Sequence, residues 1–208
     1  APMGRFVLFA VVWLSLAVFV VVLVNAEWIQ GQLIRERELV KVYLGQTIEG
    51  VLSEGTEKHY DAWFVRTGAV KAGYEKLLPD PKIPKHGMEN LAPWWFDWLE
   101  KRLDAFWWVI YQSLYRSQLI LHWLPLIAFF AACALIEGLA QRALKRSTFA
   151  YASADKHVFA KRALVLLLMS PLVYFVLPFY VHPSVVPIWG AAVVFATTVL
   201  IANAQHHV

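Results

Sequence analysis

Ser153, Asp155 and His157 are the residue types of a hydrolytic triad, and they stand close together in a polar stretch of the chain. A triad works only when the histidine reaches both the hydroxyl and the carboxylate through hydrogen bonds. Here the three residues lie two positions apart, and a helix would turn such side chains toward different faces. The spacing therefore argues against nucleophilic catalysis in this stretch.

The sequence signatures of cofactor and metal enzymes are also absent. The sequence has no P-loop, no Gly-rich dinucleotide fingerprint, no His-Glu-x-x-His helix and no CxxCH haem-attachment motif. Its single cysteine, Cys133, excludes an intrachain disulfide and lies in an apolar run, where a thiol behaves as a small hydrophobe. We therefore predict a protein that is not an enzyme and that holds no cofactor or metal.

The composition indicates a membrane protein. Of the 208 residues, 59% are hydrophobic, whereas soluble globular domains have about 45–50%. The formal net charge of +4 is not spread evenly, because residues 27–117 hold 12 Lys and Arg against 13 Asp and Glu. The excess lies in a hydrophilic segment, 141–162, with six basic residues and one acid. This distribution is typical of cytoplasmic loops of membrane proteins and argues against direct nucleic-acid binding.

Apolar runs predict an all-α membrane protein with four transmembrane helices and a helical extracytoplasmic insertion between the first and second. About 20 residues cross the hydrocarbon core. The first run is also comparable with a signal peptide, with Val24-Asn25-Ala26 as a small-residue site, but it is longer than the usual signal core. The predicted spans are Phe6–Val24, Leu119–Ala140, Ala163–Tyr180 and Val185–Ala202.

Charge fixes the predicted orientation. Short loops rich in Lys and Arg stay in the cytoplasm, so the 141–162 loop and both termini are placed there, with Arg5 before the first span. The expected location is the bacterial inner membrane. The predicted domains are an anchor (1–26), a mostly helical periplasmic region (27–117) and a three-span membrane domain (118–208).

The basic loop carries the residues that we expect to bind a partner protein or anionic lipid headgroups. Its cations flank two aromatic side chains, a pattern that suits docking of a soluble domain, while each cation near an anionic membrane surface also contributes about 1 kcal/mol. Both interpretations stay open. The predicted site comprises Arg142, Lys145, Arg146, Phe149, Tyr151, Lys156, Lys161 and Arg162.

The periplasmic region reads as three helices. A charged helix, 27–44, continues from the anchor; Thr56 caps a second, amphipathic helix that extends to Leu78. Repeated prolines predict an extended loop from Pro79 to Pro93. A third helix then begins and has no break before Pro125, so that it enters the membrane as one rod, roughly 70 Å long from 94 to 140.

Some polar and aromatic residues stand out in these helices. Trp94, Trp95 and Trp98 would form an apolar patch, which we expect a partner or a second copy of the chain to cover. Glu137 is an intramembrane acid and hence a functional candidate, although it lies about one turn from Arg142, where its side chain can reach water. His122, near the opposite end of the same span, is read as an interfacial hydrogen-bonding group.

The C-terminal half carries a series of local features, namely Tyr115-Arg116, Trp123-x-Pro125, Glu137-Gly138, a basic stretch ending at Arg146, Phe149-x-Tyr151-x-Ser153, His157, Pro171 and Pro178. In these features the chain resembles a poorly characterised family of inner-membrane proteins encoded by integrating conjugative elements and conjugative plasmids. The resemblance covers roughly residues 1–205 in layout and is specific from about 115 to 178. The family often has Asp at the position of Glu137, a chemically small departure.

The resemblance implies a component of a type IV secretion-like DNA-transfer apparatus, with the coupling-protein ATPase or another inner-membrane transfer protein as its partner. We therefore expect a non-catalytic scaffold. The alternatives are a small transporter or channel subunit, for which Ser170, Thr197 and Thr198 are a thin set of polar groups, and an accessory subunit of another complex. A redox subunit with His122 and His182 as haem ligands is a further alternative.

Overall fold

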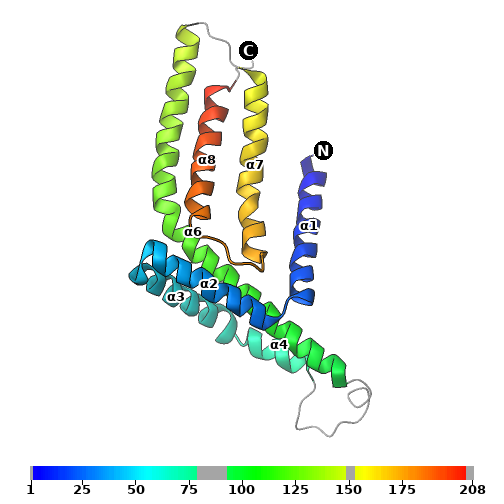
Figure 1. Ribbon diagram of the computed structural model, residues 1–208. Helices are drawn as coiled ribbons and strands as arrows, with labels where there is room; N and C mark the ends of the chain where they lie inside the picture. The colour runs from blue at the N-terminus through cyan, green and yellow to red at the C-terminus, as the bar shows by residue number, and fades with distance from the viewer. Residues whose placement is uncertain (1, 79–92, 149–152, 205–208) are drawn as a thin grey trace. The chain divides into compact units, whose positions relative to one another are not determined.

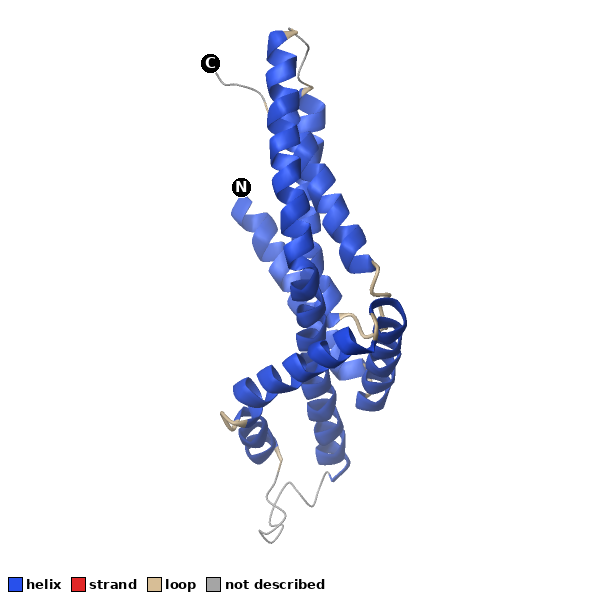
Figure 2. Cartoon of the chain, turned by 90° about the vertical axis from the view of Figure 1, so that its left-hand side faces the viewer, coloured by secondary structure: helices blue, strands red, loops and turns tan. Residues whose placement is uncertain are grey.

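The computed structural model describes residues 2–78, 93–148 and 153–204, apart from the side chains at 2–8, 93 and 146. In this part of the chain every regular element is a helix (Figure 2). The elements are α1 (Pro2–Leu23), α2 (Ala26–Leu44), α3 (Gln46–Tyr60), the π-helical turn η1 (Asp61–Val65), α4 (Ala69–Leu77), α6 (Pro93–Ser147), α7 (Ala154–Val176) and α8 (Val185–Ala202).

The predicted all-α membrane fold is confirmed at the level of helices and candidate spans. Three helices are long and apolar enough to cross a membrane, at 94–145, 154–176 and 185–202. A fourth span results if α1 and α2, which are bent by 108° at their junction, count as one crossing. The extracytoplasmic position of the insertion stays a prediction.

The chain divides into two compact units, each described here by itself. Unit 1 comprises Ala1–Gln118 and Tyr174–His182, and unit 2 comprises Leu119–Val173 and Pro183–Val208. The long helix α6 therefore contributes its first half to unit 1 and its second half to unit 2. The segment 174–182, which the sequence placed in the membrane domain, belongs to unit 1.

Unit 1 has a core built along the first half of α6. Val20 of α1, Ile29 of α2, and Ala105 and Val109 of α6 pack with Val176 at the end of α7. The buried positions of α6 continue at Gln112 and Arg116. Steps of three and four residues place all of these on one face of the helix. Figure 1 shows α2, α3 and α4 gathered along this first half of α6.

Three local predictions for unit 1 are wrong. The charged helix does not continue from the first span, because Asn25 is extended (φ −79°, ψ 148°) and α2 starts anew after it. Thr56 does not cap a helix: it lies inside α3, and its hydroxyl donates to the Leu52 carbonyl one turn back. The amphipathic stretch that follows is broken at Gly68, whose left-handed conformation (φ 76°) interrupts the helix before α4. The predicted proline loop, 79–92, lies outside the described residues.

Unit 2 packs the second half of α6 with α7 and α8. A Cβ atom on Gly190 would lie 2.6 Å from the Ile127 side chain, and one on Gly138 would lie 2.9 Å from Cβ of Ile201. From the first contact to the second, the chain advances eleven residues, or three turns, on both α6 and α8. The two helices therefore run in the same direction and pack closely along that length. The Trp189 indole donates to the Leu167 carbonyl at 2.8 Å and joins α8 to α7. Gly190 thus packs against α6.

Candidate functional site

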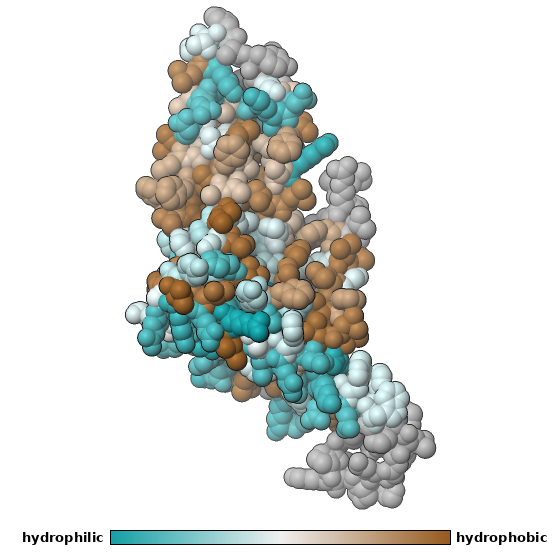
Figure 3. Space-filling view, viewed as in Figure 1, coloured by the Kyte–Doolittle hydropathy of each residue, from teal (hydrophilic) through white to brown (hydrophobic). Residues whose placement is uncertain are grey.

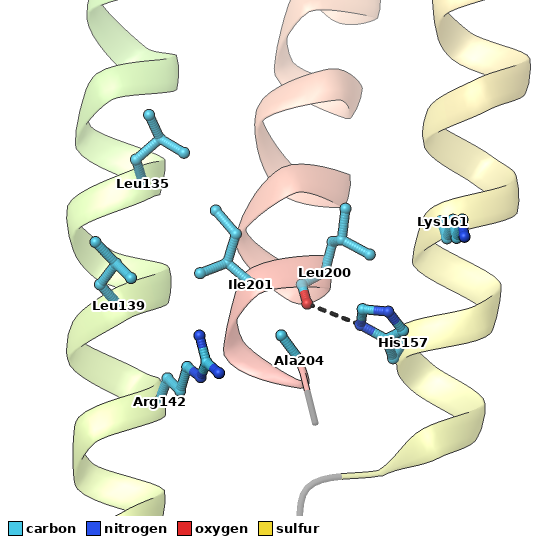
Figure 4. Close-up of a pocket in the computed structure, with 8 residues that line it drawn as sticks. All are labelled: Leu135, Leu139, Arg142, His157, Lys161, Leu200, Ile201 and Ala204. Carbon is cyan, nitrogen blue, oxygen red and sulfur yellow. Dashed lines mark hydrogen bonds between the residues drawn. The ribbon is translucent and has the colours of Figure 1, made fainter. Parts of the chain in front are cut away.

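A crevice with cationic and apolar walls opens in unit 2 between α6, α7 and α8. It has a volume of about 470 Å³ and is shown in Figure 4. Its apolar wall comprises Leu135, Leu139, Leu200, Ile201 and Ala204. Its polar groups are Arg142 on α6 and His157 and Lys161 on α7. Among the lining residues that the structure describes, two are cationic and none is acidic.

The histidine of this crevice is fixed by the end of α8. Nδ1 of His157 lies 3.1 Å from the Leu200 carbonyl oxygen, the bond drawn in Figure 4. Because that oxygen can only accept, Nδ1 carries the proton in this contact. His157 and Lys161 are separated by one helical turn and therefore share a face of α7. In Figure 4 the Arg142 guanidinium extends from α6 toward the same end of α8.

The predicted cations separate into distinct roles. Lys145 closes the end of α8, donating to the Ala202 carbonyl at 3.0 Å and to Oδ1 of Asn203 at 2.9 Å. Lys156 and Arg162 are exposed on α7. Phe149, Tyr151 and the Arg146 side chain lie outside the described residues. Hydrophilic residues gather at this end of unit 2, while hydrophobic ones cover its middle (Figure 3).

Ser153 and His157, two of the residue types of a hydrolytic triad, make separate structural contacts. Oγ of Ser153 accepts from the Lys156 backbone N–H at 3.3 Å, at the start of α7. His157 bonds instead to the Leu200 carbonyl of α8. Among the described residues, no group of three or more His, Cys, Asp or Glu is placed to hold a metal ion.

Unit 1 contains a second polar centre, which sequence reasoning missed. Arg116 and Glu36 form a fully buried ion pair, with Nη2 of Arg116 2.8 Å from Oε2 of Glu36. The guanidinium also donates to three backbone carbonyls around the end of α7, those of Tyr174 (2.5 Å), Leu177 (2.8 Å) and Phe179 (2.6 Å). It lies over the Tyr174 ring, 4.8 Å from its centroid. One side chain thus neutralises a buried acid and donates hydrogen bonds to carbonyls that have no partner within the helix at its C-terminal end.

Other side chains of unit 1 hold the same segment. Nε1 of Trp28 donates to the Pro178 carbonyl at 3.0 Å, and the Tyr180 backbone N–H donates to Oε1 of Gln32 at 3.2 Å. The Ser113 hydroxyl lies 2.9 Å from the Phe175 carbonyl. The His182 ring meets Tyr43 edge-on, with 4.4 Å between centroids. Side chains of α2 and α6 therefore hold residues 174–182 in place.

Arg102 repeats the pattern at the end of α1. It donates to the Val22 and Val24 carbonyls at 2.8 and 3.2 Å, and to Oδ1 of Asn25 at 2.7 Å. Arg102 and Arg116 are two heptads apart on α6, or roughly 21 Å along the axis. The first half of α6 thus presents two arginines that bind the C-terminal ends of two helices. In the sequence, the sign of such an arginine is its position at helical spacing with residues that pack into the core.

The other predicted residues lie on the surface. Trp94 and Trp95 are exposed by 68% and 44%, and Trp95 stacks on Trp98 with 5.0 Å between ring centroids. Glu137 is exposed and accepts a hydrogen bond from Gln141 at 2.7 Å. His122 is exposed and lies edge-on to Trp123. The structure does not test the function of any of them.

A third group of contacts ties α3 to α2. Oε1 of Glu49 accepts from Nε of Arg37 at 2.6 Å and from the Ser53 hydroxyl at 2.7 Å. Burial alone would raise the pKa of Glu49, but the hydrogen bonds from Ser53 and Arg37 and the nearby charges outweigh it and hold the pKa below its usual value. Farther along, burial and the hydrogen bond to Asp104 raise the pKa of Tyr74. These groups stabilise unit 1.

Together the fold and its cationic crevice define a helical membrane protein of three or four candidate spans. The chain belongs to the DtrJ-like family, described as "IncC plasmid conjugative DNA transfer protein DtrJ-like", whose model matches residues 24–207. This confirms the resemblance to a family of conjugative elements and implies a part in conjugative DNA transfer. No curated protein and no solved structure matches the chain.

Proposed function

We propose that this chain is a non-catalytic inner-membrane subunit of a conjugative, type IV secretion-like apparatus. In this proposal it docks the coupling-protein ATPase, or another inner-membrane transfer protein, at the cytoplasmic end of α6 and α7. Membership of the family supports a part in conjugative DNA transfer. The observation that carries the docking role is the exposed cationic start of α7.

The charges on α7 support an external partner. Lys156, Lys161 and Arg162 are exposed, and Asp155 is the acid of the first turn. The N-terminal end of a helix favours anions by about 0.3–1 kcal/mol, so Lys156 in this turn works slightly against the helix. Exposed cations of this kind fit an acidic patch on a soluble domain, and they raise the rate of encounter with it.

The test is co-purification from donor cells, combined with mating. The full chain is extracted gently from cells that carry the conjugative element, and the co-eluting proteins are identified. The coupling ATPase or another transfer protein should elute with it. Lys156→Glu with Arg162→Glu should weaken this association and lower transfer frequency at least about tenfold, as expected when two favourable charge contacts become repulsive.

The control is Lys58→Glu, a charge reversal at an exposed lysine of α3. It should leave co-purification and mating unchanged at equal protein levels. The proposal is overturned if no transfer protein co-elutes from wild type. It is also overturned if the double reversal on α7 behaves as the control does.

We also propose that Trp94, Trp95 and Trp98 are covered in the assembled apparatus by a second copy of the chain or a periplasmic subunit. Support comes from the exposure of Trp94 and Trp95 and from the contacts that join the three rings, edge-on between Trp94 and Trp95 and stacked between Trp95 and Trp98. Replacing all three with Ser should lower the mass of the complex on native gels. A complex of unchanged mass would contradict this.

A further inference from the structure

Unit 1 contains a crevice whose walls are mostly aromatic side chains. This aromatic crevice lies between α3, α4 and the first half of α6 and has a volume of about 300 Å³. Its lining side chains are half-buried, so they are partly withdrawn from water and still within reach of a ligand. The rings are those of Tyr60, Tyr74, Trp107, Trp108 and Tyr111, and Asp104 brings a carboxylate.

Contacts between the helices hold these rings in place. Tyr60 of α3 meets Tyr111 of α6 edge-on, with 5.4 Å between ring centroids, and Trp108 meets Tyr111 at 5.6 Å. A Cβ atom on Gly73 would lie 3.3 Å from the Trp107 indole, so the glycine lets α4 approach α6 closely. The aromatic crevice is therefore pre-organised, and a ligand need not pay for ordering its walls.

Asp104 places a negative charge among these rings. The Tyr74 hydroxyl donates to Oδ1 of Asp104. Burial, the Asp104 carboxylate and the nearby charge of Glu100 raise the pKa of Tyr74, so the phenol keeps its proton and remains the donor. In the part of the chain that the structure describes, no Lys or Arg forms an ion pair with Asp104. Its charge is therefore available to a ligand that enters the crevice.

Aromatic rings around one carboxylate select the chemistry of the ligand. The faces of aromatic rings attract cations, and a carboxylate accepts strong hydrogen bonds from a charged N–H group, whereas it repels an anion. A metal ion would need several oxygen ligands, and no group of three or more His, Cys, Asp or Glu among the described residues is placed to supply them. An organic cation that carries N–H donors matches both parts of the crevice.

We propose that the aromatic crevice binds a primary alkylammonium group, which either a soluble amine or the headgroup of an ethanolamine phospholipid can supply. The ammonium donates to the Asp104 carboxylate, and the carbon atoms next to the nitrogen lie among the rings of α3 and α6. Tyr74 is a positioning residue, because its hydroxyl fixes the carboxylate. This site is separate from the docking surface on α7 and does not depend on the docking role.

The first experiment is a ligand-observed NMR titration of the purified full chain in mild detergent. Ethylammonium should bind at least about tenfold more tightly than ethanol, a neutral molecule of similar size, because only the former pairs with the carboxylate. Asp104→Asn should weaken ethylammonium binding at least about tenfold, although the new amide oxygen can still accept from Tyr74. Tyr111→Leu, which removes one ring, should weaken it about fivefold.

The matched control is Asp97→Asn, which removes the same charge from an exposed position on the same helix. It should change ethylammonium binding less than twofold. Equal binding of ethylammonium and ethanol to wild type would overturn the proposal without any variant. Equal losses in the two asparagine variants would also overturn it, as would an Asp104→Asn protein with wild-type circular dichroism that binds ethylammonium as tightly as wild type.

A second experiment distinguishes the two sources of the ammonium group. Phosphatidylethanolamine and phosphatidylglycerol with identical acyl chains are titrated by native mass spectrometry. If the lipid is the source, Asp104→Asn weakens binding of phosphatidylethanolamine alone, and excess ethylammonium displaces that lipid. If a soluble amine is the source, the variant binds both lipids as wild type does while it still loses ethylammonium. Either result supports an ammonium site at Asp104.

Discussion

The two units use cations at helix ends in opposite ways. In unit 1 the guanidinium of Arg116 is fully buried, is neutralised by Glu36 and binds three carbonyls around the end of α7. In unit 2 the half-buried Lys145 binds the end of α8 through the Ala202 carbonyl and Oδ1 of Asn203. The first cation is paired with a buried acid, while the second binds two neutral oxygen atoms.

This difference shows that counting cations does not reveal their function. A buried cation with a matched acid and satisfied donors stabilises the fold and offers nothing to a ligand. A half-buried cation needs no such acid, because water still solvates part of it. Function therefore follows from local charge balance, and the following substitutions are ordered by how strongly they test this contrast.

Arg116→Met should have the largest effect. It leaves the Glu36 carboxylate buried without its partner, and it removes the donors of three carbonyls, so the free energy of unfolding should fall by about 3–5 kcal/mol. Thermal unfolding in detergent, followed by circular dichroism, measures this. Adding Glu36→Leu should restore part of the loss, because the unpaired charge is then gone.

Lys145→Met is the matched change in unit 2. It removes two hydrogen bonds from a half-buried ammonium and should cost only about 1–2 kcal/mol. If Lys145→Met costs as much as Arg116→Met, the contrast between the two units is wrong.

Gly138→Ala should have an effect of similar size to that of Lys145→Met, on packing in unit 2. The added Cβ would lie 2.9 Å from Cβ of Ile201, an atom that cannot swing away, so overpacking should cost about 1–3 kcal/mol. Gly31→Ala is the control, because nothing lies within 4 Å of its Cβ position on α2. Because alanine favours a helix more than glycine does, this change should be neutral or should stabilise the chain by up to about 1 kcal/mol. Unfolding curves in which the two variants coincide would rule out the tight seam between α6 and α8.

The pH dependence of unit 1 should show the smallest effect. The pKa of Glu49 is lowered in the folded chain, so its contribution to stability is complete above the unfolded pKa and is lost as pH falls through the folded value. Glu49→Gln should therefore destabilise the chain near neutral pH and reduce the loss of stability on acidification. The comparison is a series of unfolding curves from neutral to about pH 3. Parallel curves for the two proteins would contradict the assignment.

Elements that depend on local pattern were predicted well. The sequence predicted α8 with the bounds that are observed, 185–202, because its apolar run is continuous. It also predicted that the Trp-rich helix continues unbroken into the apolar run, and α6 does so through Pro125. Thr56 was misassigned because a hydroxyl that can cap a helix can equally bond back to a carbonyl within one.

The two polar sites were predictable to different degrees. Arg142 and Lys161 were candidates because they belong to a cationic segment, but their meeting in a crevice with His157 depends on how three helices pack. Arg116 was noticed only as part of the resemblance. Its partner Glu36 is 80 residues away, and no local periodicity connects residues at that separation. Long-range charge pairing is thus the part that pattern analysis cannot supply.

Orientation is the central claim, because the proposed docking role places the basic end of α6 and α7 in the cytoplasm. Single cysteines at Lys58 and Lys156, both exposed, are introduced into a chain whose native cysteine is replaced by Cys133→Ser. They are treated with a membrane-impermeant maleimide under conditions that give it access to the periplasm while the inner membrane is sealed. The account predicts labelling at position 58 alone, and at position 156 only after the inner membrane is opened. Labelling at position 156 across a sealed inner membrane would contradict it.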